Sequence, residues 1–567
     1  MARAKSRATG DGRGLLYATA GLVVLLSVVP MARLLVEAVL PGGGPSLQPL
    51  REVLSDPATW RATRHSLEVG FAGTLLATLI GGAAALLFTL TDIRAKGPLV
   101  FAFVLPLMIP PQIAALSWLQ VFGPSSVMLK MLGLAPPLGS PNPLYSREGI
   151  VLLLGTHFAP LVFLSLRAGL RALPKDLVEA ARASGARAPA TVARIVLPVM
   201  TPPLVAGVAL TFVSCIGNFG IPALLGIPAN YQVLTTLIFQ RLATFGPDVL
   251  SQVAILSVLI GLIAGAGIAV QGWMLKRKDY RLEGGGGEGL PFELGRRRGW
   301  IEAATWTYVL AVLVIPILAM VFTALVSGYG VPLTLETATL DNFRFILFDH
   351  DASARAFRNS LSLSAAAALL LVPVCVVLAY FIVLRRDPLA RILNFAAEMP
   401  YALPGVVLAV AAILIFIQPL PLTGGTIYNT VWIILFAYVA RFLTLELRPI
   451  VAGYHQLDPA LEEAARMCGA GILRRLWSVV LPLVAPAATA GALLVFMQAL
   501  NELTVSALLW SSGAETLGVV VYNLESGGFT TKATAVAVLA VAATVAVMLA
   551  LTLLAGRLPR GTLPWQK

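Results

Sequence analysis

The residue types that perform covalent chemistry occur in this chain, but they are not spaced for it. None of the eight lysines follows a glycine, so the phosphate-binding pattern GxxxxGK followed by Ser or Thr is absent. The three cysteines, Cys215, Cys375 and Cys468, form no CxxC pair and no metal-ligand spacing. No HExxH, GxSxG or paired-carboxylate pattern is present either. We therefore expect no catalytic residue, no bound metal and no cofactor on this chain.

Polar residues inside long apolar runs are the remaining candidates for a binding site. Glu398 lies in one such run, and Asn501 and Glu502 lie near the end of another. A carboxylate at the centre of a bilayer costs roughly 2.5–3.5 kcal/mol, so such residues usually face a cavity or a partner. The alternative for Glu502 is a fully solvated position in the outer headgroup layer. Both explanations stay open on the sequence alone.

Three further polar residues have simpler explanations. Glu446 and Arg448 fall close to the expected end of an apolar run, where we expect them to be solvated. His157 stands alone in its run, and we expect a packed or singly hydrogen-bonded side chain rather than a ligand.

The composition identifies the medium in which the chain folds. Of the 567 residues, 58% are hydrophobic and only 12% are charged, and the mean hydropathy is +0.85. These values are typical of a polytopic membrane protein. The formal net charge is +13, but Lys and Arg stand in short clusters between apolar runs, not on one basic module with aromatic residues. We expect contact with a lipid bilayer and no binding of nucleic acid.

Twelve runs of about 20 apolar residues, the length that crosses a hydrocarbon layer of roughly 30 Å, recur along the chain. They lie near 15–40, 66–90, 98–122, 148–166, 197–222, 251–274, 301–326, 359–384, 392–418, 429–447, 480–503 and 532–555. The first is too long for a signal peptide and lacks a clear cleavage site, so we expect it to be retained. The prediction is an all-α protein with about twelve transmembrane helices.

The distribution of basic residues predicts the orientation. With a cytoplasmic amino terminus and alternating spans, 30 of the 41 Lys and Arg residues fall on the cytoplasmic side. The count includes those in 1–14, 167–195, 275–299 and 441–475. Because positive charge concentrates on the cytoplasmic side of membrane proteins, we expect both termini in the cytoplasm.

The chain is an internal duplication. Residues 173–226 align without gaps on 457–510 at a constant offset of 284, with 19 of 54 positions identical. Upstream, at an offset of 294, Pro106 and Pro110 match Pro400 and Pro404. Each half is therefore one six-span unit, repeated in the same orientation.

The duplication divides the sequence into three segments. Residues 1–274 form the first six-span repeat and 300–567 the second, with a shared core of about 64–274 and 358–555. Residues 275–299 are a Gly- and Arg-rich segment, expected to be a flexible cytoplasmic linker. The offset also pairs Glu502 with Asn218, so both halves place a polar residue at equivalent depth. We expect Asn218, Asn501 and Glu502, with Glu398 as a further contributor, to line a path between the halves.

A long loop between the fourth and fifth spans occurs in each half, at 173–198 (the first loop) and 457–482 (the second loop). Plain connections need only a handful of residues. Apolar or small residues lie at helical spacing before a glycine in both loops, which predicts a helix, a turn at Gly185 or Gly469 and a second short helix. The alternative is an amphipathic helix that merely lies on lipid headgroups. Duplication at identical spacing favours a functional loop.

The two loops resemble the EAA loop of permease subunits of binding-protein-dependent ABC importers. The residues that carry the resemblance are Glu179, Ala180, Ala181 and Gly185 in the first loop and Glu463, Ala464, Ala465 and Gly469 in the second, each followed by Leu-Pro. The resemblance implies a type I importer permease of the bacterial inner membrane. It also implies that each loop seats on one of two copies of a separate ATPase, which supplies the ATP hydrolysis that this chain lacks.

The resemblance also bears on the solute. The segments NFGIPALLG at 218–226 and NELTVSALL at 501–509 look like the ferric-iron branch of these permeases, which in turn resembles thiamine, phosphonate and polyamine permeases. In such systems an extracytoplasmic binding protein selects the solute. The rival class is a major-facilitator secondary transporter, which shares twelve spans and parallel halves. Duplicated long loops have no counterpart there, and TDIRAKG after the second span is a poor match to its signature.

Overall fold

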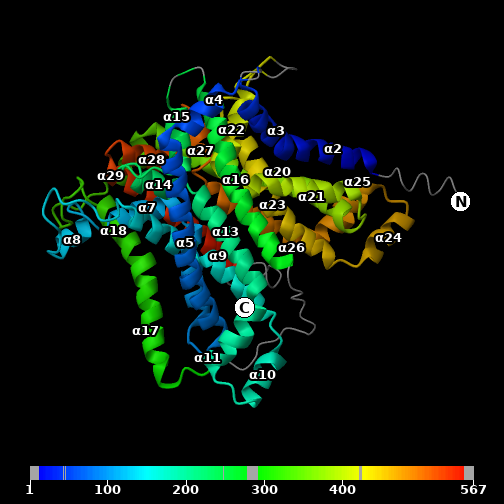
Figure 1. Ribbon diagram of the computed structural model, residues 1–567, viewed down its shortest axis with the longest axis horizontal. Helices are drawn as coiled ribbons and strands as arrows, with labels where there is room; N and C mark the ends of the chain where they lie inside the picture. Colours follow the sequence, from blue (N-terminus) through cyan, green and yellow to red (C-terminus); the bar gives the residue numbers. More distant parts are fainter. Residues whose placement is uncertain are drawn as a thin grey trace.

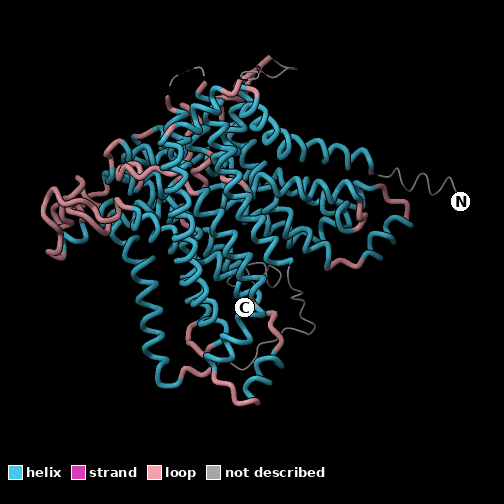
Figure 2. The backbone as a smooth tube through the Cα atoms, viewed as in Figure 1, coloured by secondary structure: helices cyan, strands magenta, loops and turns pink. Residues whose placement is uncertain are grey.

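The computed structural model describes residues 12–276 and 292–554, apart from 42, 43, 45, 245, 247 and 420–423. Within these residues the chain consists of helices and loops, with two isolated bridges and no strand (Figure 2). The two chain ends and most of the expected linker, with its Gly284–Gly287 run, lie outside the described residues. The expectation of an all-α polytopic protein is confirmed.

The helices of the first half, including the π-helical turns η1 and η3, have the following bounds. They are α2 Arg13–Val23, η1 Val24–Val28, α3 Val29–Val39, α4 Gln48–Ser55, α5 Pro57–Leu90, α6 Lys96–Met108, α7 Pro111–Leu119, α8 Val127–Met131, α9 Arg147–Arg171, α10 Lys175–Ala183, α11 Ala188–Thr191, η3 Val192–Val196, α12 Leu197–Val199, α13 Thr201–Gly217, α14 Gly220–Leu225, α15 Leu234–Leu242 and α16 Val249–Lys276.

The second half repeats this order, with a short 3₁₀ turn η4 at its start and π-helical turns η5, η6 and η7. Its helices are η4 Gly295–Arg297, α17 Arg298–Val309, η5 Leu310–Val314, α18 Ile315–Ala324, α19 Asp341–Arg344, η6 Phe345–Asp349, α20 Asp351–Val383, α21 Pro388–Ala402, α22 Gly405–Phe416, α23 Val431–His455, α24 Pro459–Met467, α25 Ile472–Arg475, η7 Leu476–Val480, α26 Leu481–Leu500, α27 Ser506–Leu509, α28 Leu517–Ser526 and α29 Thr530–Leu554.

Every predicted span corresponds to helix, but not every span is straight. Among the described residues, eight helical segments are long and apolar enough to cross a membrane unaided. Three helix pairs pass the same test only together and are bent at a short break, as in a broken span or a re-entrant loop: α6–α7 by 99°, α11–η3–α12 with α13 by 71°, and α21–α22 by 106°. The remaining predicted span is α23, whose 25 residues include three charged side chains. The expectation of single runs at 98–122, 197–222 and 392–418 therefore misses the bends.

Proline accounts for the position of the bends. Pro110 and Pro404 precede α7 and α22 at equivalent places in the two halves. A proline has no backbone N–H to donate to the preceding turn, and its ring disfavours a helical residue before it. In the fifth span, Pro202 and Pro203 follow the bend, whereas the equivalent positions in the unbroken eleventh span are Pro486 and Ala487.

The halves form two arms that diverge. Helices α5, α9 and α13 pack together in the first arm, and α20, α23 and α26 pack together in the second. Figure 1 shows the arms joined near α7, α14, α22 and α28 and spread apart toward α10 and α24. Small residues let the helices of an arm approach closely, as expected for packing in a membrane. For example, Gly81 of α5 lies so close to α9 that an added Cβ would be 2.2 Å from the carbonyl oxygen of Ala159.

The first span of each half crosses to the other half. The segment α2–η1–α3 packs against α20, α21 and α22, and α17–α18 packs against α6 and α7. In Figure 1, α17 accordingly runs beside the first arm and α2 beside the second. The boundaries 1–274, 275–299 and 300–567 are thus divisions of the sequence, and the folded halves are interlocked.

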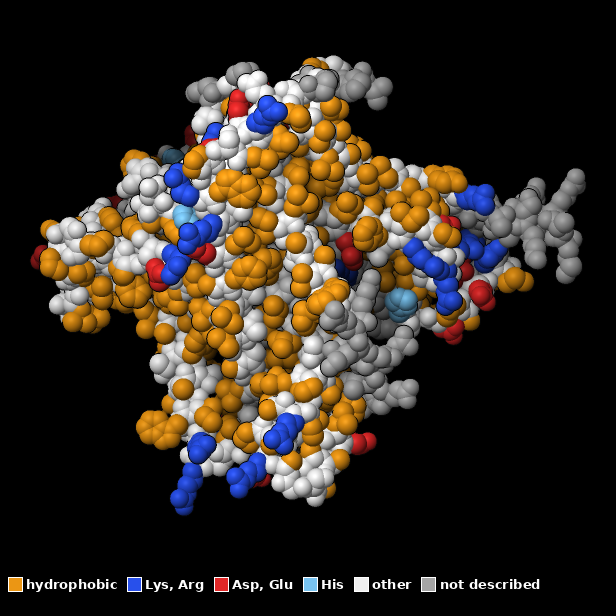
Figure 3. Space-filling model, in the orientation of Figure 1, with side chains coloured by type: hydrophobic (Ala, Val, Ile, Leu, Met, Phe, Trp, Pro, Cys, Tyr) orange, Lys and Arg blue, Asp and Glu red, His pale blue; other side chains and the backbone are white. Residues whose placement is uncertain are grey.

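The outer surface suits a lipid environment. On α5, Phe71, Leu75 and Leu79 are each 62% exposed at a spacing of one helical turn, which makes an outward apolar stripe. Figure 3 shows hydrophobic side chains over much of the visible face, with Lys and Arg in patches at the ends of the arms (bottom and right) and at the upper left.

We predict that both loops lie on the cytoplasmic side. Ala188 and Gly471 are exposed in the two loops, so cysteine at either position is a suitable reporter. The exposed native Cys468 is first replaced by Ser, while buried Cys215 and Cys375 stay. An impermeant thiol reagent should label each reporter only after the cells are permeabilised. Labelling in intact cells would contradict the orientation.

Candidate functional site

The first loop folds as a helix, a glycine turn and a short second helix. Helix α10 ends at Ala183, and Gly185 has φ of 77°, a left-handed conformation that favours glycine. The N–H of Ala186 donates to the carbonyl of Ala181 over 3.0 Å and closes the helix end. Helix α11 and the π turn η3 then lead to Leu197 at the start of α12. The predicted helix–glycine–helix shape is confirmed.

The second loop repeats this geometry. Gly469 also has φ of 77°, and the N–H of Ala470 donates to the carbonyl of Ala465 over 3.1 Å. The π turn η7 follows at the same offset of 284 from η3. A duplicated turn geometry thus accompanies the duplicated sequence.

The motif residues of both loops present side chains to solvent. Glu179 and Ala180 in α10, and Glu463 and Ala464 in α24, are exposed. Leu177 and its equivalent Leu461, one turn earlier, are 37% and 48% exposed. The next alanine of each motif is less exposed: Ala181 is buried and Ala465 is half-buried. Each arm therefore ends in a small apolar and acidic surface, with α10 and α24 at the tips of the arms in Figure 1.

A buried charged cluster anchors the second loop. Glu462, beside the motif, pairs with Arg475 of α25 over 3.1 Å, and their side chains are 11% and 1% exposed. Tyr380 of α20 donates its hydroxyl to Glu462 over 2.7 Å and accepts from Arg385 over 2.9 Å. The cluster joins the loop to the end of a membrane helix.

The first loop is anchored by apolar contacts instead. The positions equivalent to Glu462, Arg475 and Tyr380 are Val178, Thr191 and Leu86. Val178 and Leu86 pack against the core of the first arm. Buried Thr191 donates only to the carbonyl of Arg187 in its own helix. The loops thus share a backbone shape but differ in what holds it.

Asn218 and Glu502 cap equivalent helix breaks. Asn218 follows α13, and its Oδ1 accepts from the N–H of Ile221 over 2.9 Å. Glu502 follows α26, and its Oε1 accepts from the N–H of Val505 over 3.0 Å. These side chains satisfy backbone donors that the interrupted helices leave unpaired.

The same breaks bring the two halves together. The Asn501 side-chain amide donates to the carbonyl of Met108, at the bend of the other half, over 2.7 Å. Gly217, the equivalent of Asn501, lies against Pro404, where an added Cβ would come within 3.2 Å of the proline Cα. Asn501 also borders a mostly apolar cavity of about 270 Å³ between α7 and helices α20, α26 and α29. Three of the four expected path residues therefore stand at the junction of the halves.

Arg441 belongs to this group, although the sequence reasoning counted it with a cytoplasmic loop. It lies in α23, and its Nε is 3.4 Å from Glu502 Oε2, with the two side chains 20% and 11% exposed. A fully solvated Glu502 in the headgroup layer does not fit this burial. The signal that could have identified Arg441 is its position inside the predicted run 429–447.

Two further carboxylates, Glu398 and Glu446, differ in their surroundings. Glu398 pairs with Arg448 over 3.4 Å in a largely exposed ion pair, and its contribution to the path stays a prediction. The expectation that Glu446 is solvated is wrong, because Glu446 is fully buried against Gly491 and neither carboxylate oxygen has a hydrogen-bond partner. The error arose because α23 continues to His455, past the predicted end of the span.

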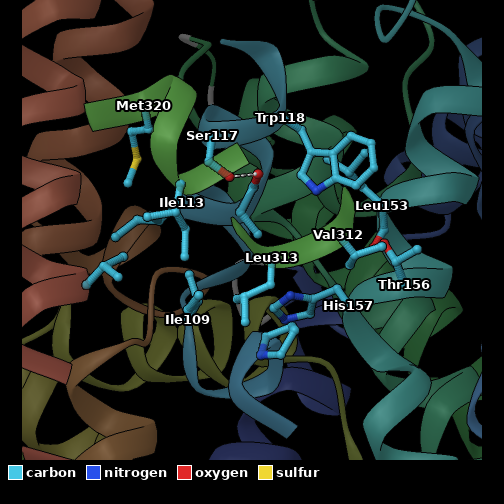
Figure 4. Close-up of a pocket in the computed structure, with 14 residues that line it drawn as sticks. Ile109, Ile113, Ser117, Trp118, Leu153, Thr156, His157, Val312, Leu313 and Met320 are labelled. Atoms are coloured by element: carbon cyan, nitrogen blue, oxygen red, sulfur yellow. Dashed lines mark hydrogen bonds between the residues drawn. The ribbon is translucent and has the colours of Figure 1, made fainter. Parts of the chain in front are cut away.

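His157 is packed, as expected. It is 4% exposed and lies edge-on to Phe158 at 4.8 Å. Figure 4 shows it beside Ile109 and Leu313 at a cavity of about 30 Å³, room for one or two water molecules. Its Nδ1 has no protein partner. Across the part of the chain that the structure describes, no group of three or more His, Cys, Asp or Glu residues could hold a metal ion.

We predict that Glu462→Gln loosens the second loop. The change removes the negative charge beside buried Arg475, and breaking a buried ion pair costs about 3–5 kcal/mol. Hydrogen exchange of the amides in α24 and α25 should accelerate. The control is Glu463→Gln, the exposed neighbour, which should leave exchange unchanged. Equal exchange in the two variants would show that the cluster does not anchor the loop.

Comparison with known proteins agrees with this architecture. The family model described as "Binding-protein-dependent transport system inner membrane component" matches twice, at residues 73–277 and 372–563. Both matches begin after the first span of their half, and each includes one of the two loops. The family match thus reproduces the duplication.

Individual relatives are similar over much of the chain. A probable ABC transporter permease of Sinorhizobium fredii is 28% identical over 505 residues, which cover 87% of this chain and 86% of the relative. A ferric transport system permease of Actinobacillus pleuropneumoniae is 27% identical over 467 residues, 80% of this chain and 65% of the relative. A probable molybdenum ABC transporter permease of Haloferax volcanii is 27% identical over 255 residues, 45% of this chain and 87% of the relative. This chain belongs to the inner-membrane components of binding-protein-dependent ABC transport systems, and it carries the family's unit twice.

Proposed function

We propose that the chain is the transmembrane permease component of an ATP-driven importer, with one ATPase subunit seated on each of the two loops. A solute-binding protein outside the cytoplasm delivers the solute to the opposite face. Both chain termini lie in the cytoplasm with the loops. ATP is bound and hydrolysed by the partner subunits alone.

The pair of helix–glycine–helix loops carries this proposal. They have the same φ at the glycine and the same closing hydrogen bond, and they lie at the tips of two diverging arms. Exposed Leu, Ala and Glu side chains on each offer an apolar surface with an acidic flank. Two equal docking sites on separate arms suit a pair of identical motor subunits, whose approach would draw the arms together.

The arrangement of the arms supports a path between them. The arms are apart at the loop end and joined at the other end, where Gly217 contacts Pro404 and Asn501 contacts Met108. In the proposed cycle these contacts separate when the loop ends close. The solute then passes Asn218, Asn501 and Glu502. Glu398, in its exposed pair with Arg448, stays a further candidate for the path.

We predict that valine in place of Gly469 uncouples transport. Valine at φ of 77° costs about 1–3 kcal/mol of backbone strain, so the turn should change shape while the membrane helices still insert. ATP-dependent uptake should fall, with a further fall when Gly185→Val is added.

A matched control is available two residues away. Gly471 has an ordinary φ of −64°, and an added Cβ would meet nothing within 4 Å. Gly471→Val should therefore keep wild-type uptake. Wild-type uptake in Gly185→Val/Gly469→Val would refute coupling through the loops.

Ferric iron is the solute that we propose. Similarity to two ferric transport permeases over 80% and 89% of this chain supports it. Relatives named for sulfate, molybdenum and 2-aminoethylphosphonate match less of this chain. Thiamine, phosphonate and polyamine remain the alternatives within the same importer class.

Uptake measurements test the solute directly. Cells that express the chain with its ATPase and binding protein should accumulate radiolabelled ferric iron, and the binding protein alone should bind it. The control is a cell that lacks only this chain. Saturable uptake of another solute with no uptake of iron would refute the assignment and leave the importer mechanism intact.

A further inference from the structure

Arg441 lies deep within a membrane helix. It is ten residues into α23, about 15 Å along the axis at 1.5 Å per residue, and about 21 Å from the end at His455. A charged side chain at such depth faces a partner or a path rather than lipid. Only 20% of the Arg441 side chain is exposed.

Glu502 supplies the counter-charge, and its own oxygens are already engaged. Oε2 lies 3.4 Å from Arg441 Nε, and Oε1 accepts from the N–H of Val505. The pair carries no net charge. Glu502 thus acts as a helix cap and as the counter-ion of Arg441, and neither of its oxygens is free to bind a cation.

Arg441 keeps a spare donor at the junction of the halves. Its NH1 is buried and has no hydrogen-bond partner. An added Cβ on Gly405 would lie 2.8 Å from this nitrogen. Gly405 follows Pro404, the residue that Gly217 of the first half contacts. When the halves separate, the guanidinium is therefore beside the opening.

The first half has no such group. The positions equivalent to Arg441 and Glu502 are His157 and Asn218, and Pro111 replaces Gly405. The buried guanidinium of Arg441 therefore has no counterpart at the equivalent position of the first half.

We propose that Arg441 contacts the solute, with Glu502 as the counter-ion that holds it in place. The group that passes presents oxygen acceptors, either as an oxyanion or as the oxygen ligands of a metal complex. A planar guanidinium with a free N–H edge matches such oxygens. The inference rests on the proposed import function. For iron, it means a ligated ferric ion rather than a bare one.

Three variants test this in the full complex with its ATPase and binding protein. Arg441→Lys keeps the charge pair but loses the spare planar donor. Arg441→Gln/Glu502→Gln removes both charges together, so no buried charge is left alone. Glu502→Gln alone removes only the counter-ion. The control is Arg448→Gln, an exposed arginine two turns along the same helix.

Uptake is followed with ferric citrate and, in parallel, with molybdate, so that the two sources of oxygen ligands are distinguished. Arg441→Lys and the double variant should assemble normally but lose uptake by at least about tenfold, the effect of one charged hydrogen bond. Arg448→Gln should stay within about twofold of wild type, since an exposed pair contributes little.

Two results would overturn the inference. The first is wild-type uptake in the double variant, which would mean that Arg441 makes no contact with the solute. The second is wild-type uptake in Arg441→Lys together with loss in Glu502→Gln, which would mean that Glu502 binds a bare cation. The importer proposal has its own readouts. It predicts that the Arg448→Gln chain co-purifies with the ATPase and shows ATP-dependent uptake. Loss of co-purification and of this uptake would refute the importer proposal rather than the role of Arg441.

Discussion

A backbone N–H or C=O without a partner is costly in a hydrocarbon layer, and this protein interrupts its helices in several places within its membrane-spanning units. Asn218 and Glu502 satisfy amides at equivalent breaks, and Asn501 satisfies the carbonyl of Met108 across the junction of the halves. Polar side chains stand at the junction because the broken backbone requires them there. The proposed path therefore passes the places where side chains cap the broken helices and where the two halves touch.

Duplication preserved the backbone more closely than the interactions that support it. Both loops turn at a left-handed glycine, yet Glu462 and Arg475 hold one loop with charge, where Val178 and Thr191 stand in the other. At the junction, the second half has a guanidinium–carboxylate pair where the first has His157 and Asn218. One chain can thus offer two equal sites to a symmetric partner and still treat the solute asymmetrically.

Hydropathy and repeat analysis predicted the helices and the loops, because apolar length and the position of glycine determine both locally. They could not predict the 99° and 106° bends, since a bent pair has the same composition as a straight span. They placed Glu446 and Arg441 at the cytoplasmic boundary, because charged residues usually mark the end of a span. In the structure α23 continues past both residues to His455. The exchange of the first spans between halves depends on packing between distant segments, which no local pattern records.

In the proposed cycle the arms close at their loop ends when the partner ATPase binds ATP. Arg187 and Gly471 are equivalent exposed positions in the two loops, beside the motif helices. Spin labels on cysteines at these positions, in a Cys468→Ser chain reconstituted with its ATPase and binding protein, report the separation of the arms. We expect a shorter distance between the labels with bound ATP and a return to the longer distance after hydrolysis. An unchanged distance in a complex that imports its solute would contradict it.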